Sequence, residues 1–208
     1  LTTAQVAGLT TAQAAGLTSA ALGGLEVADI VALTTAQAAV MSSGQIAALG
    51  SAAVAAMETA DIAALSTAAV RGLTAAQMAA LTSGQAQALT TAQLAALSTA
   101  AVTALQPGVF ANLTTPQMAA LTTMQAAVIN SAQLAALTTT QIAALTTGQL
   151  AALSALAIPG LTTADIVALT TAQAAVLTSA QLAGMGAAEV TAFETADLAA
   201  LTPATLRG

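Results

Sequence analysis

The chain has 208 residues, of which 57% are hydrophobic and 5% are charged, and its formal net charge is −6. It contains no His, Cys, Lys, Trp or Tyr, so the usual general bases, thiol nucleophiles, Schiff-base amines and soft metal ligands are missing. This composition argues against an enzyme and indicates no cofactor, and two arginines in an acidic chain argue against nucleic-acid binding.

From Leu1 onward the chain is a repeat of eight residues. Twenty-six octads follow one another without insertion or deletion, from Leu1–Gly8 to Leu201–Gly208. The first position is Leu in all but five octads, which carry Met41, Met57, Ile129, Met185 and Phe193. The second position is Thr or Ser in nineteen octads, the fifth is Gln in fourteen, and the sixth is apolar. Such strict periodicity predicts a repeat architecture.

Each octad carries the signature of a helix start. Thr at position 2 and Gln at position 5 form a capping box, and the apolar residues at positions 1 and 6 fit the hydrophobic staple beside it. Leu89, Thr90, Gln93 and Leu94 illustrate the pattern, and the next example is Leu137, Thr138, Gln141 and Ile142. Several octads end in Gly, as is typical of helix C-termini. We therefore predict one short helix of five or six residues per octad.

One continuous helix is the main alternative. Because eight residues turn about 800°, its leucines would drift by about 80° per octad and cover the whole surface. A β-solenoid is disfavoured because positions 4, 7 and 8 are mostly Ala. Short helices must stack to be stable. We predict an all-α solenoid, one continuous domain over residues 1–208 that is a segment of a longer chain or a filament subunit.

The mean hydropathy of +0.86 raises the question of a membrane span. A spanning helix needs about 20 apolar residues, whereas Thr, Ser or Gln interrupts nearly every octad. No membrane span is expected.

Three octads pair acidic residues at positions 2 and 5. The pairs are Glu26 with Asp29, Glu58 with Asp61, and Glu194 with Asp197. We interpret them as favourable charges in a first helical turn that also keep the chain soluble. The alternative is that these carboxylates bind Ca²⁺. A further alternative concerns the threonines at positions 2 and 3, whose regular rows could bind ice.

Prolines test the phase of the repeat independently. Pro107 and Pro203 occupy position 3, which is the first helical position if position 2 is the cap, and proline is favoured there. The phase therefore agrees with the capping box.

A second period is superimposed on the octads. Octads with a weakened fifth position follow one another at spacings of six, five, six and six octads, and they carry Ala21, Ala69, Val109, Ala157 and Thr205. The hypothesis is a superhelix with five to six octads per turn. The alternative is ancestral duplication followed by drift, since Ala53 and Ala101 fall outside this schedule.

The octads Leu89–Ala96 and Leu137–Ala144 resemble octapeptide arrays of very large secreted surface proteins of Gram-negative bacteria, which are adhesin-like or RTX-like. The resemblance implies an extracellular or cell-surface setting and a scaffold or fibre role. The Gly/Asp nonapeptides of RTX proteins are absent, so no calcium ligands are carried over. We expect a filament, fibre or stalk that self-associates end to end or laterally. The alternative is an adhesin module that binds a surface or carbohydrate through one face.

Overall fold

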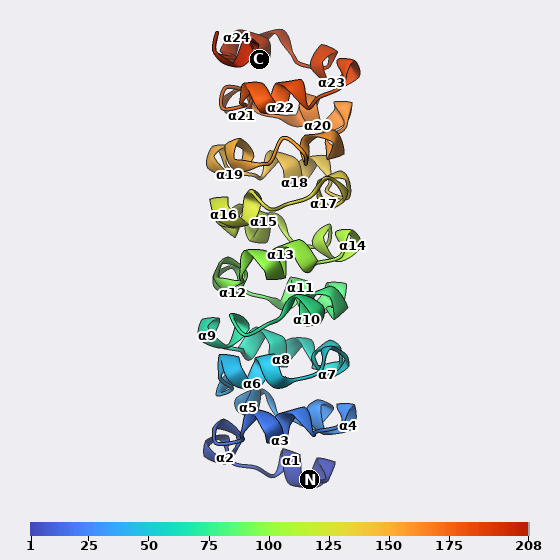
Figure 1. The fold of residues 1–208 in the computed structure, drawn as a ribbon, viewed down its shortest axis with the longest axis vertical. Coiled ribbons are helices and arrows are strands. Elements are labelled where there is room, and N and C mark those ends of the chain that lie inside the picture. Colours follow the sequence, from blue (N-terminus) through green and yellow to red (C-terminus); the bar gives the residue numbers. More distant parts are fainter. Residues whose placement is uncertain (208) are drawn as a thin grey trace. The chain divides into compact units, whose positions relative to one another are not determined.

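The computed structural model describes residues 1–207, and within this range the chain is helical, without β-strands. One short helix forms in each octad (Figure 1), which confirms the predicted all-α solenoid. The residues divide into two compact units, Leu1–Leu105 and Gln106–Gly208. A single continuous domain over residues 1–208 stays a prediction.

The helices of the first unit are α1 (Thr3–Ala7), α2 (Thr11–Ala15), α3 (Ser19–Gly23), α4 (Val27–Val31), α5 (Thr35–Ala39), α6 (Ser43–Ala48), α7 (Ser51–Ala56), α8 (Thr59–Ala64), α9 (Thr67–Val70), α10 (Ala75–Ala80), α11 (Ser83–Ala88), α12 (Thr91–Ala96) and α13 (Thr99–Ala104). Those of the second unit are α14 (Pro107–Phe110), α15 (Thr115–Ala120), α16 (Thr123–Ala126), α17 (Ser131–Ala135), α18 (Thr139–Ala143), α19 (Thr147–Ala152), the 3₁₀-helix η1 (Ile158–Gly160), α20 (Thr163–Ala168), α21 (Thr171–Ala174), α22 (Ser179–Ala183), α23 (Ala187–Thr191), α24 (Thr195–Ala200) and the 3₁₀-helix η2 (Thr205–Arg207).

The helices begin and end where the capping pattern places them. Position 2 is extended, as at Thr90 with φ −68° and ψ 159°, and its side chain accepts a hydrogen bond from the backbone of position 5. Position 1 of the next octad is extended again, as at Leu97 with φ −61° and ψ 148°. The two extended residues form a corner, and each helix is limited to the residues between two corners.

Helices three octads apart pack against each other. In the first unit α7 contacts α10, and α10 contacts α13. In the second unit α18 contacts α20, which belong to octads three apart because η1 occupies the octad between α19 and α20. Figure 1 shows these helices lying over one another within each unit.

The prediction of five to six octads per turn is therefore wrong. A helix of five or six residues is about 8 Å long, and packed helices lie about 8–10 Å apart. Three helices can share one core of Leu and Val side chains, whereas a ring of five or six would leave a central hole. The spacing of six octads between the weakened positions spans two turns rather than one.

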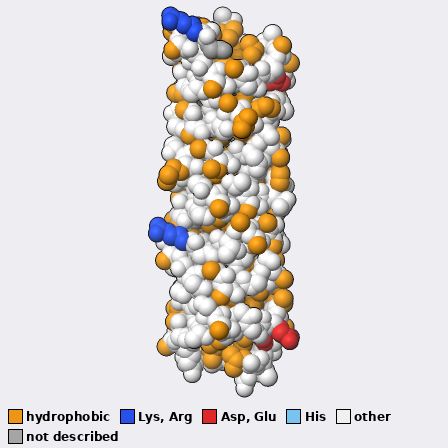
Figure 2. All heavy atoms as spheres, in the orientation of Figure 1, with side chains coloured by type: hydrophobic (Ala, Val, Ile, Leu, Met, Phe, Trp, Pro, Cys, Tyr) orange, Lys and Arg blue, Asp and Glu red, His pale blue; other side chains and the backbone are white. Residues whose placement is uncertain are grey.

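The core consists of positions 1 and 6, as predicted. Leu89 is 2% exposed and Leu94 is fully buried, and Leu137 and Ile142 repeat the arrangement in the second unit. The face drawn in Figure 2 carries few charged side chains. No helix in the described part of the chain combines the length and apolar character needed to cross a membrane.

Glycines at octad ends lie at helix C-termini, as predicted, and Gly8, Gly16, Gly24 and Gly184 are C-cap residues. Among residues 1–207 no glycine has a positive φ, so none supplies a left-handed helix cap. Instead, a Cβ at Gly72 would lie 2.0 Å from the carbonyl oxygen of Ser43, and one at Gly160 would lie 2.3 Å from that of Ser131. These two glycines let the backbones of successive turns meet.

Candidate functional site

The feature that recurs through both units is a set of hydrogen bonds made by the glutamine at position 5. The Gln93 carbonyl oxygen Oε1 accepts from the Thr90 backbone N–H at 2.7 Å, and the Gln93 backbone N–H donates to Thr90 Oγ1 at 3.2 Å. This is the predicted capping box. Gln141 and Thr138 form the same box in the second unit, with distances of 2.9 and 3.3 Å.

The other end of the same side chain joins one turn to the preceding one. Gln93 Nε2 donates to the carbonyl oxygens of Ile62 at 2.9 Å and Leu65 at 2.6 Å. Gln141 Nε2 donates to Leu113 at 2.6 Å. Because helix C-termini and corners leave carbonyls without intrahelical partners, these inter-turn glutamine bonds satisfy groups that stacking would otherwise bury unpaired.

The register of these bonds is constant. The acceptors lie 31 and 28 residues before the glutamine, at position 6 of one octad and position 1 of the next. The same register occurs at Gln45, Gln85, Gln149 and Gln181. These glutamine side chains are 1–4% exposed. One buried amide therefore caps its own helix and holds the previous turn.

The sequence indicated only the capping role of this glutamine, and its second role was missed. A capping box accepts Glu as readily as Gln, but position 5 holds Gln fourteen times and Glu once, at Glu189. Only the amide has N–H groups to donate. This bias was the available signal for a buried acceptor opposite position 5.

The acidic pairs are placed on short helices as cap and third residue. Glu26, Glu58 and Glu194 are exposed N-cap residues, and Asp29, Asp61 and Asp197 are buried. Asp29 Oδ2 accepts from the Glu26 backbone N–H at 3.2 Å, so this aspartate takes part in capping. Within residues 1–207 no three acidic side chains come together as a metal cluster. Calcium binding stays a prediction.

Asp61 stands apart from the other aspartates. It is 1% exposed, and its Oδ1 accepts from Thr35 Oγ1 at 2.9 Å. Its Oδ2 is buried and has no hydrogen-bond partner among the described residues. The constant register places the carbonyls of Ile30 and Leu33 opposite Asp61, where glutamine would donate and a carboxylate cannot.

Both prolines predicted at the first helical position lie at the start of their octads. Pro107 opens α14 after the extended Gln106. Pro203 lies in a turn two residues before η2, and the backbone N–H of Thr205 donates to Thr202 Oγ1 at 3.1 Å. The capping threonine is thus retained there, although the helix is 3₁₀ rather than α.

The threonines divide by position. Thr90 and Thr138 at position 2 are engaged in capping, whereas Thr91, Thr139 and Thr147 at position 3 are exposed. An ice-binding face would therefore consist of the threonines at position 3 alone. Ice binding stays a prediction.

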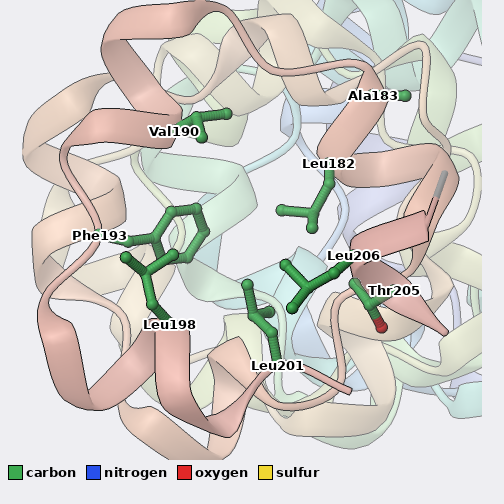
Figure 3. A pocket seen from close by; sticks show the side chains of 8 residues that line it. All are labelled: Leu182, Ala183, Val190, Phe193, Leu198, Leu201, Thr205 and Leu206. Atoms are coloured by element: carbon green, nitrogen blue, oxygen red, sulfur yellow. The ribbon is translucent and has the colours of Figure 1, made fainter. Parts of the chain in front are cut away.

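Two cavities occur in the second unit. One of about 250 Å³ lies at its C-terminal end, where Val190, Phe193, Leu198, Leu201 and Leu206 point toward a common centre (Figure 3). The other, of about 260 Å³, is lined by Ile129, Asn130, Ser154 and Leu156, among others. The Leu156 side chain is 86% exposed.

A family profile described as the ALTTAQ repeat matches residues 22–58 and 54–91. The chain carries the ALTTAQ repeat. The letters ALTTAQ are those of Ala32–Gln37, which include the corner and the capping box of Thr34 and Gln37. The match confirms the predicted octapeptide array, and the ALTTAQ octad continues in phase on both sides of the matched residues. No curated protein matches the chain.

Proposed function

We propose that this ALTTAQ array is a structural protein rather than an enzyme. It forms an extracellular filament, a fibre or the stalk of a surface protein, through end-to-end or lateral self-association. Its setting is the bacterial cell surface or the extracellular space.

The observation that carries this proposal is the constant register of the inter-turn glutamine bonds. Gln45 in the first unit and Gln181 in the second donate to carbonyls at the same offsets of 31 and 28 residues. Stability in such an array comes from nearest-neighbour contacts, so each added turn gains the same bonds as the last. An array in which every turn repeats the same stacking contact can be extended turn by turn. This property fits a filament or stalk better than a protein built around a single binding site.

The composition supports the same proposal. With 5% charged residues the surface offers little electrostatic repulsion between copies. The resemblance to arrays of secreted surface proteins supports the extracellular setting.

The test is assembly of the purified chain. Sedimentation velocity over a range of concentrations, followed by negative-stain microscopy, is expected to show growing species and fibres of uniform width. Antibody labelling of intact cells that make the protein is expected to equal the labelling of permeabilised cells. A chain that stays monomeric at every concentration contradicts self-association, and labelling only after permeabilisation contradicts the surface setting.

A second candidate function is an adhesin module that binds through one face. The observation that favours it is Leu156, which is 86% exposed beside the cavity of about 260 Å³. Wild type and Leu156→Lys can be compared on a glycan array and on hydrophobic beads, with Met124→Lys as control because Met124 is also 71% exposed. If only Leu156→Lys loses binding to the glycans or the beads, the result favours this function. If wild type and both variants bind equally, the result contradicts it.

A further inference from the structure

A buried carboxylate without a compensating charge lies inside the first unit. The Asp61 side chain in α8 is 1% exposed. Arg71, the one arginine of this unit, is exposed, and no ion pair joins it to Asp61 among residues 1–207. Burial of a carboxylate is costly unless an opposite charge and hydrogen bonds compensate it. Asp61 therefore lacks, among the described residues, the partner that its charge requires.

The carboxylate of Asp61 reaches toward the preceding turn. Its Oδ1 accepts from Thr35 Oγ1 at 2.9 Å, and no capping box forms at the start of its own helix. Asp165, at the same position of another octad, is different: its Oδ2 accepts from the Thr162 backbone N–H at 2.8 Å and from Thr162 Oγ1 at 2.7 Å. Oδ2 of Asp165 is thus used in capping, whereas Oδ2 of Asp61 is buried without a partner.

Two backbone carbonyls lie opposite Asp61. At the constant register of 31 and 28 residues they are those of Ile30 and Leu33, and the bond from Thr35 shows that Asp61 lies against this turn. Ile30 O accepts from the Leu33 backbone N–H at 3.1 Å and keeps a second lone pair, and no described residue donates to Leu33 O. Aspartate is one methylene shorter than glutamine, so Oδ2 ends before the position that Gln93 Nε2 takes between its two carbonyls. Three oxygen acceptors therefore converge on one buried position.

We propose that Asp61 Oδ2 and the carbonyl oxygens of Ile30 and Leu33 bind an alkali cation, Na⁺ or K⁺. Such a cation compensates the buried charge and is coordinated by all three oxygens, as backbone carbonyls coordinate these ions in channels and transporters. A water molecule offers two protons to three acceptors and brings no charge. Ca²⁺ takes about six to eight oxygen ligands, more than the structure brings together here. The site is independent of the proposed function, and it joins two turns as the glutamine amide does elsewhere.

Salt-dependent stability of the full chain tests the site. Thermal unfolding is followed by circular dichroism in NaCl, KCl or choline chloride, each at about 0.2 M so that ionic screening is equal. Choline is too large for a site between two stacked turns. With a dissociation constant about tenfold below the salt concentration, the better of the two alkali cations should raise the Tm by about 3–5 °C over choline. The rises in NaCl and in KCl distinguish the two ions.

Variants at position 5 assign the response to Asp61. Asp61→Gln supplies an amide that donates to the two carbonyls in place of the cation, so its Tm is expected to be the same in all three salts. Asp61→Asn removes the charge at unchanged side-chain length and is expected to lose the response as well. Asp165→Gln is the matched control, and it should keep the full response because the Asp165 carboxylate is engaged in capping.

Sodium NMR provides a direct measurement of binding. Wild type and Asp165→Gln are expected to broaden the sodium line, and Asp61→Gln is expected to leave it unchanged.

Three results overturn the proposal. Equal Tm values of wild type in the three salts show that Oδ2 is completed by water or a proton instead. An alkali response that persists in both Asp61 variants shows that the ions act elsewhere. A larger rise in CaCl₂ at the same ionic strength, lost in Asp61→Gln, overturns the assignment to a monovalent ion.

Discussion

Two neighbouring octads of the second unit contact the previous turn in different ways. In the octad of α19, Thr146 caps a six-residue helix, and Gln149 Nε2 donates to the carbonyls of Met118 at 2.8 Å and Leu121 at 2.6 Å. In the next octad the fifth residue is Ala157, and the chain forms only the 3₁₀-helix η1. There Gly160 lies against the carbonyl of Ser131.

The difference shows two ways of joining successive turns. A glutamine octad reaches the previous turn with a long polar side chain and satisfies its carbonyls. The side chain of Ala157 cannot reach the previous turn, and the backbone at Gly160 approaches it instead, which requires a residue without Cβ. The first unit repeats the second arrangement, since Ala69 at position 5 is followed by Gly72, whose Cβ would meet Ser43. The pairs Ala69 with Gly72 and Ala157 with Gly160 therefore share one arrangement, whereas Ala53 and Ala101 are followed by Ala at position 8 and their octads form six-residue helices.

The largest effect is expected for Gly160→Ala. Its Cβ would lie 2.3 Å from the Ser131 carbonyl oxygen and 3.0 Å from the Leu134 Cβ, so one turn must shift. We expect a loss of about 3 kcal/mol in the free energy of unfolding, measured by guanidinium denaturation with circular dichroism at 222 nm. Gly148→Ala in α19 is the control: its Cβ makes ordinary contact with Thr123, so it should stabilise by about 0.5–1 kcal/mol. Equal effects of both substitutions would contradict the close approach.

The next effect concerns the glutamine bonds. Gln149→Ala removes the donor to buried carbonyls and is expected to cost about 2–3 kcal/mol. Gln13→Ala is the matched control, because Gln13 caps its helix but has no preceding turn to bind among the described residues, and about 0.5 kcal/mol is expected. The same guanidinium denaturation measures the free energy of unfolding of both variants. If the two losses are equal, the inter-turn bonds contribute nothing beyond capping.

The smallest effect has the opposite sign. Asp61→Gln supplies a donor opposite Ile30 and Leu33 and removes the buried Oδ2 that lacks a partner. We expect a gain of about 1 kcal/mol. Asp29→Gln is the control, because Asp29 Oδ2 already accepts from the Glu26 backbone N–H and only the Leu1 carbonyl lies at its register among the described residues, so a smaller gain is expected there. A destabilised Asp61→Gln chain would show that the carboxylate has a role that the register does not explain.

Local features of this fold were predictable because they depend on residues three or four apart. Thr90 and Gln93 lie within one turn of helix, so their capping box follows from the octad alone, as does the burial of Leu89 and Leu94. The number of octads per turn was not predictable in the same way. It depends on how many short helices can enclose one core without a hole, and the six-octad period misled because it spans two turns.

The inter-turn glutamine bonds were only partly predictable from the sequence. The bias toward Gln over Glu at position 5 is visible in the sequence, but its meaning depends on carbonyls that belong to the preceding turn. The glycines were likewise visible at octad ends, and only stacking showed that Gly72 and Gly160 are needed for space rather than for a positive φ.

The sequence by itself determined the unit: a capped helix of five or six residues with apolar positions 1 and 6, because capping and helix periodicity act within eight residues. Some octads form helices of only four residues, such as α9 and α21. The tertiary structure decided how the units meet. It set three octads between stacked helices and gave the glutamine amide its second partner. The physical reason is that stacking brings together groups far apart in the chain, and a periodic sequence is equally consistent with any number of units per turn.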